Sequence, residues 1–321
     1  MKYRLPSILV ATVLSLSLLI GCKSWQTAST PKKVLVVSVT TGFRHSSIET
    51  AERIIAKIGA DSGAFTVDYA RVTPPKPASR KPTATKETGD AEKDKAAKEK
   101  YDADLAKFQV DDAKFKEAQK SYADEQKKVL AEKMSPEALK NYDAVIFANT
   151  TGDLPLPDNQ AFIDWVKAGH GFVAIHSGSD TFHGFKPYIE MLGGEFKTHG
   201  PQVTVTAINK DPNHPATKPL PAQWEIFDEI YEFKSHEQGN VKELLSMDKH
   251  PQNKAPGYNG ISWYRNVGQG RVFYTSLGHR EDMWDPEWKE ANGSRKNPPA
   301  IALAYQQHVL GGIKWALGLD K

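Results

Sequence analysis

The chain has 321 residues, of which 39% are hydrophobic and 25% charged, and this composition is that of a globular protein rather than a disordered or fibrous one. Its formal net charge is +3, and two of the cationic side chains, Lys2 and Arg4, lie in a segment that we expect to be removed. A balance so close to neutral argues against nucleic acid or an anionic membrane surface as the binding partner.

The N-terminal segment has the pattern of a bacterial lipoprotein leader followed by a tether. A short basic head precedes an apolar run over residues 5–20, which is shorter than the roughly 20 residues of a membrane-spanning helix. The run ends in Leu-Ile-Gly-Cys, which resembles a lipobox with Cys22 as the lipidated residue. We therefore expect a signal peptide over residues 1–21, a tether over residues 22–33, and a lipid-anchored protein outside the cytoplasm, on the periplasmic face of an outer membrane or at the cell surface. The alternatives are an ordinary signal peptide or an uncleaved anchor.

The cysteine content limits the chemistry of the mature chain. Cys22 is the only cysteine in the sequence. Once it is lipidated, the protein has no thiol for a disulfide, a metal site or a nucleophile. Any catalytic centre must therefore use other side chains.

The elements that follow alternate between strands and helices. Residues 34–39 form a β-branched run typical of a strand buried on both faces, and a helix should begin at Ser46 or Ser47, cap with that hydroxyl, and end at Gly59. The remaining strands are predicted over residues 65–72, 142–149, 171–175, 203–208, 225–233, 261–265 and 271–276, and the remaining helices over residues 158–168, 185–192 and 300–317. This alternation predicts an α/β fold with a mostly parallel sheet flanked by helices, whose last two strands form a hairpin.

Residues 74–135 interrupt this alternation. Residues 74–90 are rich in Pro, Lys and Thr, and residues 91–133 are rich in Ala, Lys, Glu and Asp, which mostly favour helix. A seven-residue repeat of apolar side chains predicts one narrow stripe on a long helix or helical hairpin, formed by Tyr101, Phe108, Phe115, Tyr122 and Val129. The stripe either docks a partner or packs on its own domain or its own return helix, and we favour the second. We thus predict one domain over residues 34–318 with a charged helical insertion over residues 74–135.

Four loops that follow predicted strands are unusually polar. They comprise residues 42–45, 149–153, 176–180 and 278–282. Ligands of parallel α/β sheets bind beyond the carboxyl ends of the strands, so we expect these loops to form one pocket. A single histidine in a loop is more often structural than catalytic, but four such loops together favour a functional site.

The side chains in these loops support two kinds of chemistry. Histidine titrates near neutral pH, and Asp180, Asp228 or Glu229 could tune an imidazole for general acid–base catalysis. Alternatively, neutral imidazoles and a carboxylate could hold a divalent metal, assembled from separate loops because no closely spaced ligand pair occurs. A serine nucleophile at Ser177 or Ser179 would need a base within hydrogen-bond reach and is less favoured.

Seven sequence blocks, in the same order, resemble those of the ThuA-like (trehalose utilisation) family. They cover residues 41–45, 149–152, 172–181, 192–199, 214–217, 228–231 and 270–279. The family's fold is similar to that of class I glutamine amidotransferases, which implies a flavodoxin-like α/β arrangement here. The resemblance also implies a role in the catabolism of disaccharides, glycosides or their 3-keto derivatives, alongside a sugar oxidoreductase. The helical insertion is not part of the family pattern.

The class I amidotransferases place a nucleophilic cysteine in an Ile-Cys-x-Gly turn and a His-x-Glu motif after a late strand. The corresponding segments of this chain are Ile-His-Ser-Gly, with His176 at the nucleophile position, and His-Arg-Glu, beginning at His279. The resemblance therefore implies that the turn is retained and that His176 replaces the nucleophile. Without a thiol, a cysteine-dependent glutaminase is excluded.

The candidate site follows from these motifs and from the resemblance. The catalytic residues are predicted to be His176 and His279, as an acid–base pair, with Asp180 and Glu281. The substrate-binding residues are predicted to be Arg44, His45, Asn149, Thr150, Thr151, His199, Asp228, Glu229, Tyr231 and Trp263. The reaction we envisage is proton abstraction beside a keto-sugar carbonyl, leading to elimination, hydrolysis or isomerisation, with a divalent metal as a further option. The alternative is a non-catalytic, surface-tethered sugar-binding protein.

Other aromatic and histidine side chains have less support. Two of five aromatic side chains near the loops are expected in the pocket, out of Phe43, Phe182, Tyr231, Trp263 and Trp284. His199 and His214 either touch substrate or shape their loops. His170, His250 and His308 are expected at the surface.

Overall fold

A computed structural model describes Met1 and residues 30–320 of the chain. The predicted signal peptide, the lipobox and Cys22 lie outside the described residues. Within the described part, no helix combines the length and the apolar character needed to cross a membrane.

A nine-stranded sheet is the centre of the fold, and its two halves differ in strand direction. In spatial order it contains β2 (Phe65–Ala70), β1 (Lys32–Val37), β3 (Ala144–Ala148), β4 (Gly171–Ile175), β11 (Gly270–Thr275), β10 (Pro256–Val267), β9 (Lys242–Lys249), β6 (Val203–Asn209) and β7 (Gln223–Asp228). The pairs from β2 to β11 are parallel and those from β11 to β7 are antiparallel. The α/β prediction is confirmed, but the sheet is mixed, and its parallel half alone has the 2-1-3-4-5 order of a flavodoxin-like sheet.

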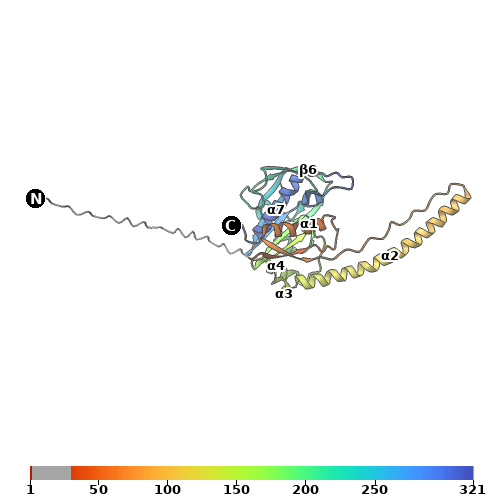
Figure 1. The fold of residues 1–321 in the computed structure, drawn as a ribbon, viewed down its shortest axis with the longest axis horizontal. Helices are drawn as coiled ribbons and strands as arrows, with labels where there is room; N and C mark the ends of the chain where they lie inside the picture. The colour runs from red at the N-terminus through yellow and green to blue at the C-terminus, as the bar shows by residue number, and fades with distance from the viewer. Residues whose placement is uncertain (2–29, 321) are drawn as a thin grey trace. The chain divides into compact units, whose positions relative to one another are not determined.

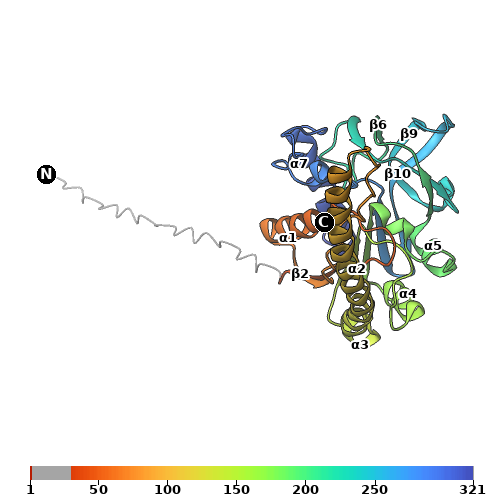
Figure 2. The same ribbon diagram turned by 90° about the vertical axis from the view of Figure 1, so that its right-hand side faces the viewer.

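Helices cover both faces of the parallel half. On one face α1 (Ile48–Ser62) and α7 (Pro299–Ala316) pack against alternate residues of β1, β3 and β4. On the other face lie α4 (Asn159–Lys167), α5 (Lys186–Leu192), α3 (Pro136–Leu139) and the end of α2 (Ala91–Met134). Figures 1 and 2 show α1 and α7 on one side of the sheet and α4 on the other. All side chains of β3 and β4 are therefore buried, which explains their continuous apolar sequence.

The antiparallel half departs from the prediction in two places. The expected hairpin of β10 and β11 forms, with Val267 opposite Gly270. However, the strand predicted over residues 225–233 is two strands, because the chain leaves the large sheet after β7 and re-forms as β8 (Tyr231–Lys234). β8 pairs with β5 (Glu195–His199) in a separate two-stranded sheet. Neither β5 nor β9 was predicted.

Helix α1 begins without the predicted serine cap. Ser47 occupies the N-cap position, but its hydroxyl makes no capping bond and donates instead to the Gly278 carbonyl, 3.1 Å away. The helix also continues past Gly59 and ends at Gly63, whose φ of 63° suits a left-handed C-cap. The start of α1 is thereby tied to the loop after β11.

The charged segment folds as one helix rather than a helical hairpin. The segment over residues 74–90 runs beside α2 (Figure 1), and Asp90 caps the helix by accepting a bond from the Lys93 N–H. All five side chains of the apolar stripe are half-buried. Tyr101 shares a hollow with residues 84–87, and Phe115 shares another with residues 75–79. The stripe therefore packs on its own chain, which favours the self-packing interpretation, although the partner is an extended segment.

Candidate functional site

Three of the polar loops bring their histidines into contact. His45 follows β1, His176 follows β4 and His279 follows β11, so all three lie beyond the carboxyl ends of parallel strands. The imidazole centroids of His45 and His176 are 4.8 Å apart, and each lies 5.2 Å from that of His279. Residues more than 200 positions apart in sequence thus form one group of rings.

Glu229 adds a carboxylate to these rings from the break between β7 and β8. Its Oε2 lies 3.3 Å from His279 Nδ1 and 3.6 Å from His176 Nε2. Its Oε1 lies 3.0 Å from Nδ1 of His199, which pairs with Tyr231 across the two-stranded sheet. The Tyr231 hydroxyl is 2.8 Å from His176 Nε2. The strand break is what turns Glu229 and Tyr231 toward the histidines.

The backbone and a carbonyl group fix the orientation of His176. The residue lies in the sharp turn that follows β4 and has a φ of 49°, a backbone conformation that is uncommon for residues other than glycine. Its Nδ1 lies 2.7 Å from the Ser276 carbonyl, which can only accept a hydrogen bond. Nδ1 therefore carries the proton, and in the neutral ring Nε2 presents a lone pair to Tyr231, His279 and Glu229.

Burial and charge separate the protonation behaviour of the three histidines. Burial lowers the pKa of His176 well below its usual value and that of His45 to about 4. Burial also lowers the pKa of His279, but the hydrogen bond and negative charge of Glu229 outweigh it and raise that pKa above its usual value. His45 and His176 are therefore neutral at pH 7, as metal ligands and hydrogen-bond acceptors must be.

Asn149 and Asp228 hold the loop that carries His279. Both are fully buried, and the substrate-binding role expected of them stays a prediction. Asp228 Oδ2 accepts a 2.7 Å bond from the Gly278 N–H, and Asn149 Nδ2 donates to the Gly278 carbonyl at 2.9 Å. Burial raises the pKa of Asp228 to about 6. These bonds hold the residue before His279, where the φ of Gly278 is 117°.

Several other predicted residues make their contacts elsewhere. Thr150 and Thr151 are buried and bond to Thr181 and Thr40, so their hydroxyls serve the packing of neighbouring loops. Arg44 pairs with Glu49 at 2.7 Å.

Asp180, Glu281 and Trp263 also lie outside the histidine cluster. Asp180 pairs with His183, whose other ring nitrogen lies 2.7 Å from Glu195. Glu281 begins α6 (Glu281–Trp284) and acts on His279 only by raising its pKa through its charge. Trp263 is fully buried in the core, and its indole N–H donates to the Leu192 carbonyl at 2.8 Å.

Among the five aromatic side chains, two lie at the cluster. Tyr231 contacts His176, and the Phe43 ring meets that of His45 edge to face at 4.9 Å while 68% of the Phe43 side chain stays exposed. The other three, Phe182, Trp263 and Trp284, are buried in the core. The expectation that His250 and His308 lie at the surface is wrong, because both are buried.

Three contributors to the site had no sequence signal for the role that they play. The Ser276 carbonyl orients His176, but a backbone group carries no residue-specific pattern. Ser47 bonds to Asn149 and to the loop after β11, although its position before α1 indicated a helix cap. Ser177, considered only as a nucleophile, has its hydroxyl 3.2 Å from His45 Nδ1.

The cluster is open to solvent on one side. His176 is fully buried, whereas the His279 and His199 side chains are 21% and 45% exposed. Exposed Phe43 lies beside His45 at the same group of loops. A small molecule can therefore approach from the side of His199 and His279.

The same four side chains have the composition of a metal site. One ligand atom each from His45, His176, Glu229 and His279 can be chosen so that all four lie within 4.8 Å of one another. Neutral imidazoles and a carboxylate are the usual ligands of first-row transition metals in proteins. The same groups can also exchange protons, so the arrangement allows both kinds of chemistry raised by the sequence.

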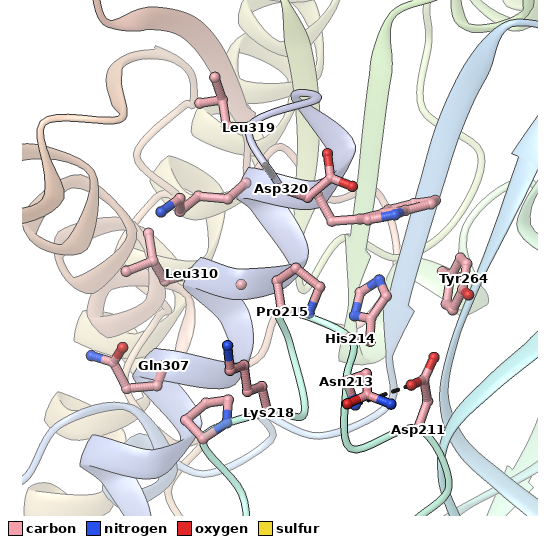
Figure 3. A pocket seen from close by; sticks show the side chains of 14 residues that line it. Asp211, Asn213, His214, Pro215, Lys218, Tyr264, Gln307, Leu310, Leu319 and Asp320 are labelled. Carbon is pink, nitrogen blue, oxygen red and sulfur yellow. Dashed lines mark hydrogen bonds between the residues drawn. The ribbon is translucent and has the colours of Figure 1, made fainter. Parts of the chain in front are cut away.

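His214 lies in a different place, in a hollow of about 610 Å³ between α7 and the loop after β6 (Figure 3). Its ring stacks on Tyr264 with centroids 4.5 Å apart. Its Nδ1 accepts a bond from the Ala216 N–H at 3.1 Å. These contacts support the loop-shaping interpretation of His214.

Comparison with known sequences identifies the family. The sequence profile of the trehalose utilisation family, ThuA, matches residues 85–291, which is more than half of the chain. The chain belongs to the ThuA family. No curated protein is similar to this ThuA protein in sequence. The profile match includes α2, so whether residues 74–135 are an insertion stays a prediction.

Solved structures agree on the fold of this ThuA protein. It is similar to a ThuA-like protein from Parabacteroides merdae ATCC 43184, with a TM-score of 0.57 and 17% identity over 89% of this chain and 90% of that one. It is also similar to one from Bacteroides uniformis ATCC 8492, with a TM-score of 0.52 and 17% identity over 90% and 92% of the two chains. The resemblance to the family seen in the sequence is therefore confirmed.

Proposed function

We propose that this ThuA protein is an enzyme of carbohydrate catabolism whose catalytic centre is the cluster of His45, His176, His279 and Glu229. The observation that carries the proposal is the convergence of these four side chains from separate segments of the chain. Burying polar and ionisable groups is costly unless they are paired or used, and such groups gather at functional sites. A role in holding the fold together would not need three imidazoles and a carboxylate at the exposed end of the sheet.

The substrate class follows from the family and from the chemistry beside the cluster. The family is one of trehalose utilisation, which supports a disaccharide, a glycoside or a 3-keto derivative as the substrate. Phe43 offers an exposed apolar ring beside His45, and such a ring suits the C–H face of a sugar. The proposed reaction removes a proton from the carbon beside a sugar carbonyl, and elimination, hydrolysis or isomerisation follows.

The setting of this activity is proposed from the sequence. The leader pattern supports secretion, a lipid anchor on Cys22, and a position outside the cytoplasm, on the periplasmic face of an outer membrane or the cell surface. A 3-keto sugar must be produced by oxidation, so a sugar oxidoreductase is the partner that we propose for the pathway. Nucleic acid has no part in this proposal.

Turnover by the purified full chain tests the proposal. Trehalose, other disaccharides and glycosides, and their 3-keto derivatives would each be incubated with the protein, and products followed by mass spectrometry. His176→Ala should lower turnover by about 100-fold or more, as expected when a central catalytic group is lost. His170→Ala is the matched control, because His170 precedes β4 at its opposite end and stacks on Trp165 with ring centroids 4.1 Å apart. Unchanged turnover in His176→Ala would refute the assignment of the centre.

A second function, sugar binding without catalysis, is favoured by one observation. The turn that holds the cysteine nucleophile in amidotransferases holds His176 here, so the nucleophilic chemistry of that fold is lost. Saturable binding of a sugar with no product from any substrate would support a tethered binding protein in place of the enzyme.

A further inference from the structure

We propose that His45, His176, His279 and Glu229 bind one divalent transition-metal ion. This adds a cofactor to the centre proposed above, and only the use of the ion, not its binding, rests on the proposed function. The first support is the spacing of the ligand atoms. His279 Nδ1 lies 3.3 Å from both His176 Nε2 and Glu229 Oε2. The distance between His176 Nε2 and Glu229 Oε2 is 3.6 Å.

These separations match those around a bound ion. Zinc–nitrogen and zinc–oxygen bonds of 2.0–2.1 Å at tetrahedral angles hold neighbouring ligand atoms about 3.3 Å apart. Three of the four residues therefore already have the spacing of a first coordination shell. A ligand atom of His45 lies within 4.8 Å of the other three and would have to move closer to complete the set.

The second support is the electrostatics between His176 and Glu229. Because Nδ1 of His176 donates to the Ser276 carbonyl, its Nε2 lone pair faces the Glu229 carboxylate across 3.6 Å. Two electron-rich atoms at this distance repel each other unless a positive group lies between them. The Tyr231 hydroxyl lies 2.8 Å from Nε2 of His176, and Nδ1 of His279 lies 3.3 Å from the same atom. A divalent ion would satisfy all of these lone pairs at once.

The third support is an outer shell of hydrogen bonds that orients the ligands. His176 is held by the Ser276 carbonyl at 2.7 Å, and His45 Nδ1 lies 3.2 Å from the Ser177 hydroxyl. The second carboxylate oxygen of Glu229 lies 3.0 Å from His199. Metal-binding histidines and carboxylates characteristically have such partners, which fix the tautomer and the direction of the ligand.

The ligand types limit which ion can bind. Three imidazoles and one carboxylate suit Zn²⁺, Mn²⁺, Fe²⁺ or Co²⁺, whereas Mg²⁺ and Ca²⁺ prefer oxygen ligands. The His279 and His199 side chains are 21% and 45% exposed, so a substrate oxygen could reach the ion from this side. When bound, the ion would polarise a sugar carbonyl. His199, which lies outside the ligand set, would then accept the proton that the neighbouring carbon releases as its C–H electron pair moves toward the carbonyl.

Direct metal binding tests this proposal. The full chain would carry Cys22→Ser so that its one thiol cannot bind metal, and would be freed of metal with a chelator. Zn²⁺, Mn²⁺ and Co²⁺ would be titrated in by calorimetry, and the visible spectrum of bound Co²⁺ would report its coordination. We expect one ion per chain. His279→Ala and the nearly isosteric Glu229→Gln should weaken binding by about 100-fold or more, since loss of an outer-shell partner alone costs 10–100-fold.

His170→Ala is the matched control and should bind the ion as the unaltered protein does, because its ring stacks on Trp165 and bonds to the Trp165 carbonyl at the far end of β4. The proposal is overturned if none of the three ions binds saturably, or if folded His279→Ala and Glu229→Gln bind as tightly as the parent. Turnover that persists in chelated protein would show that the reaction needs no metal, while the proposal of an enzyme would stand. A bound ion with no turnover of any sugar would support the metal site and contradict the proposed enzyme.

Discussion

Replacing His308 should reduce the acid sensitivity of the fold. The side chain is fully buried on α7, and its Nδ1 donates to the Ala216 carbonyl at 2.9 Å. Its Nε2 has no hydrogen-bond partner in the described part of the chain. The titratable groups that face it are His214 and Tyr305. Protonation would therefore place a charge and an unpaired N–H in an apolar site, and burial lowers the pKa of His308 from 6.5 to about 4.

The size of the effect follows from proton linkage. Between these two pKa values the unfolded chain binds a proton at His308 that the folded chain does not. Neutral His308 therefore does not lower the unfolding free energy above pH 6.5. The unfolding free energy then falls as the pH falls from 6.5 toward 4. A pKa difference of about 2.5 units, at 1.36 kcal/mol per unit, corresponds to about 3 kcal/mol of unfolding free energy.

His308→Asn provides the comparison, because its amide can still donate to the Ala216 carbonyl but does not titrate. Urea unfolding would be followed by tryptophan fluorescence in steps from pH 7.5 to about 4.5, a window set by the two pKa values. The unfolding free energy of the variant should fall by about 2 to 3 kcal/mol less across that range than that of the parent. All other titratable groups are shared, so parallel pH curves would refute the reasoning.

Two further predictions concern packing and buried charge. Gly311→Ala should destabilise the protein by about 1–3 kcal/mol in urea unfolding, because the added Cβ would lie 2.2 Å from the Pro215 carbonyl oxygen and this clash outweighs the better helix propensity of alanine. Gly239→Ala, which meets no atom within 4 Å, should leave stability unchanged, and equal stabilities for the two variants would contradict the packing argument. Asp282→Asn should lower the free energy of unfolding by about 3 kcal/mol, because buried Asp282 pairs with Arg280 at 2.9 Å and also accepts backbone N–H bonds. A loss below about 1 kcal/mol in thermal or urea unfolding would contradict this prediction.

The sequence predicted the parallel half of the sheet well because burial on both faces leaves a local signal. The strand expected over residues 171–175 is β4 itself, and all of its side chains are buried. β9 also has four consecutive buried residues, but charged residues on both sides of them hide the pattern. β5 is exposed over most of its length and has no apolar pattern to detect. Local patterns thus identify strands where burial is uniform, as in β4, or alternates, as in β7.

The candidate site was predictable in its residues but not in its geometry. The rule that ligands bind at strand ends selected the loops of His45, His176 and His279, and the family resemblance added Glu229. The break between β7 and β8 was hidden because buried residues continue through Ile230 on both sides of it. Distances between these side chains depend on how strands far apart in sequence pair, and no local pattern encodes that. The full burial of Trp263 was not predictable either, because a buried and a substrate-facing aromatic look alike in sequence.

The mixed sheet explains how side chains from distant strands meet at one site. The parallel half presents the turn after β4, which holds an imidazole whose Nδ1 is bonded to the Ser276 carbonyl. The antiparallel half then adds Glu229 through the strand break after β7. A single nucleophile needs only one loop, whereas a set of ligands or proton carriers needs several fixed directions of approach. The convergence of both halves of the sheet on His176 therefore fits a multi-residue centre better than a single nucleophile.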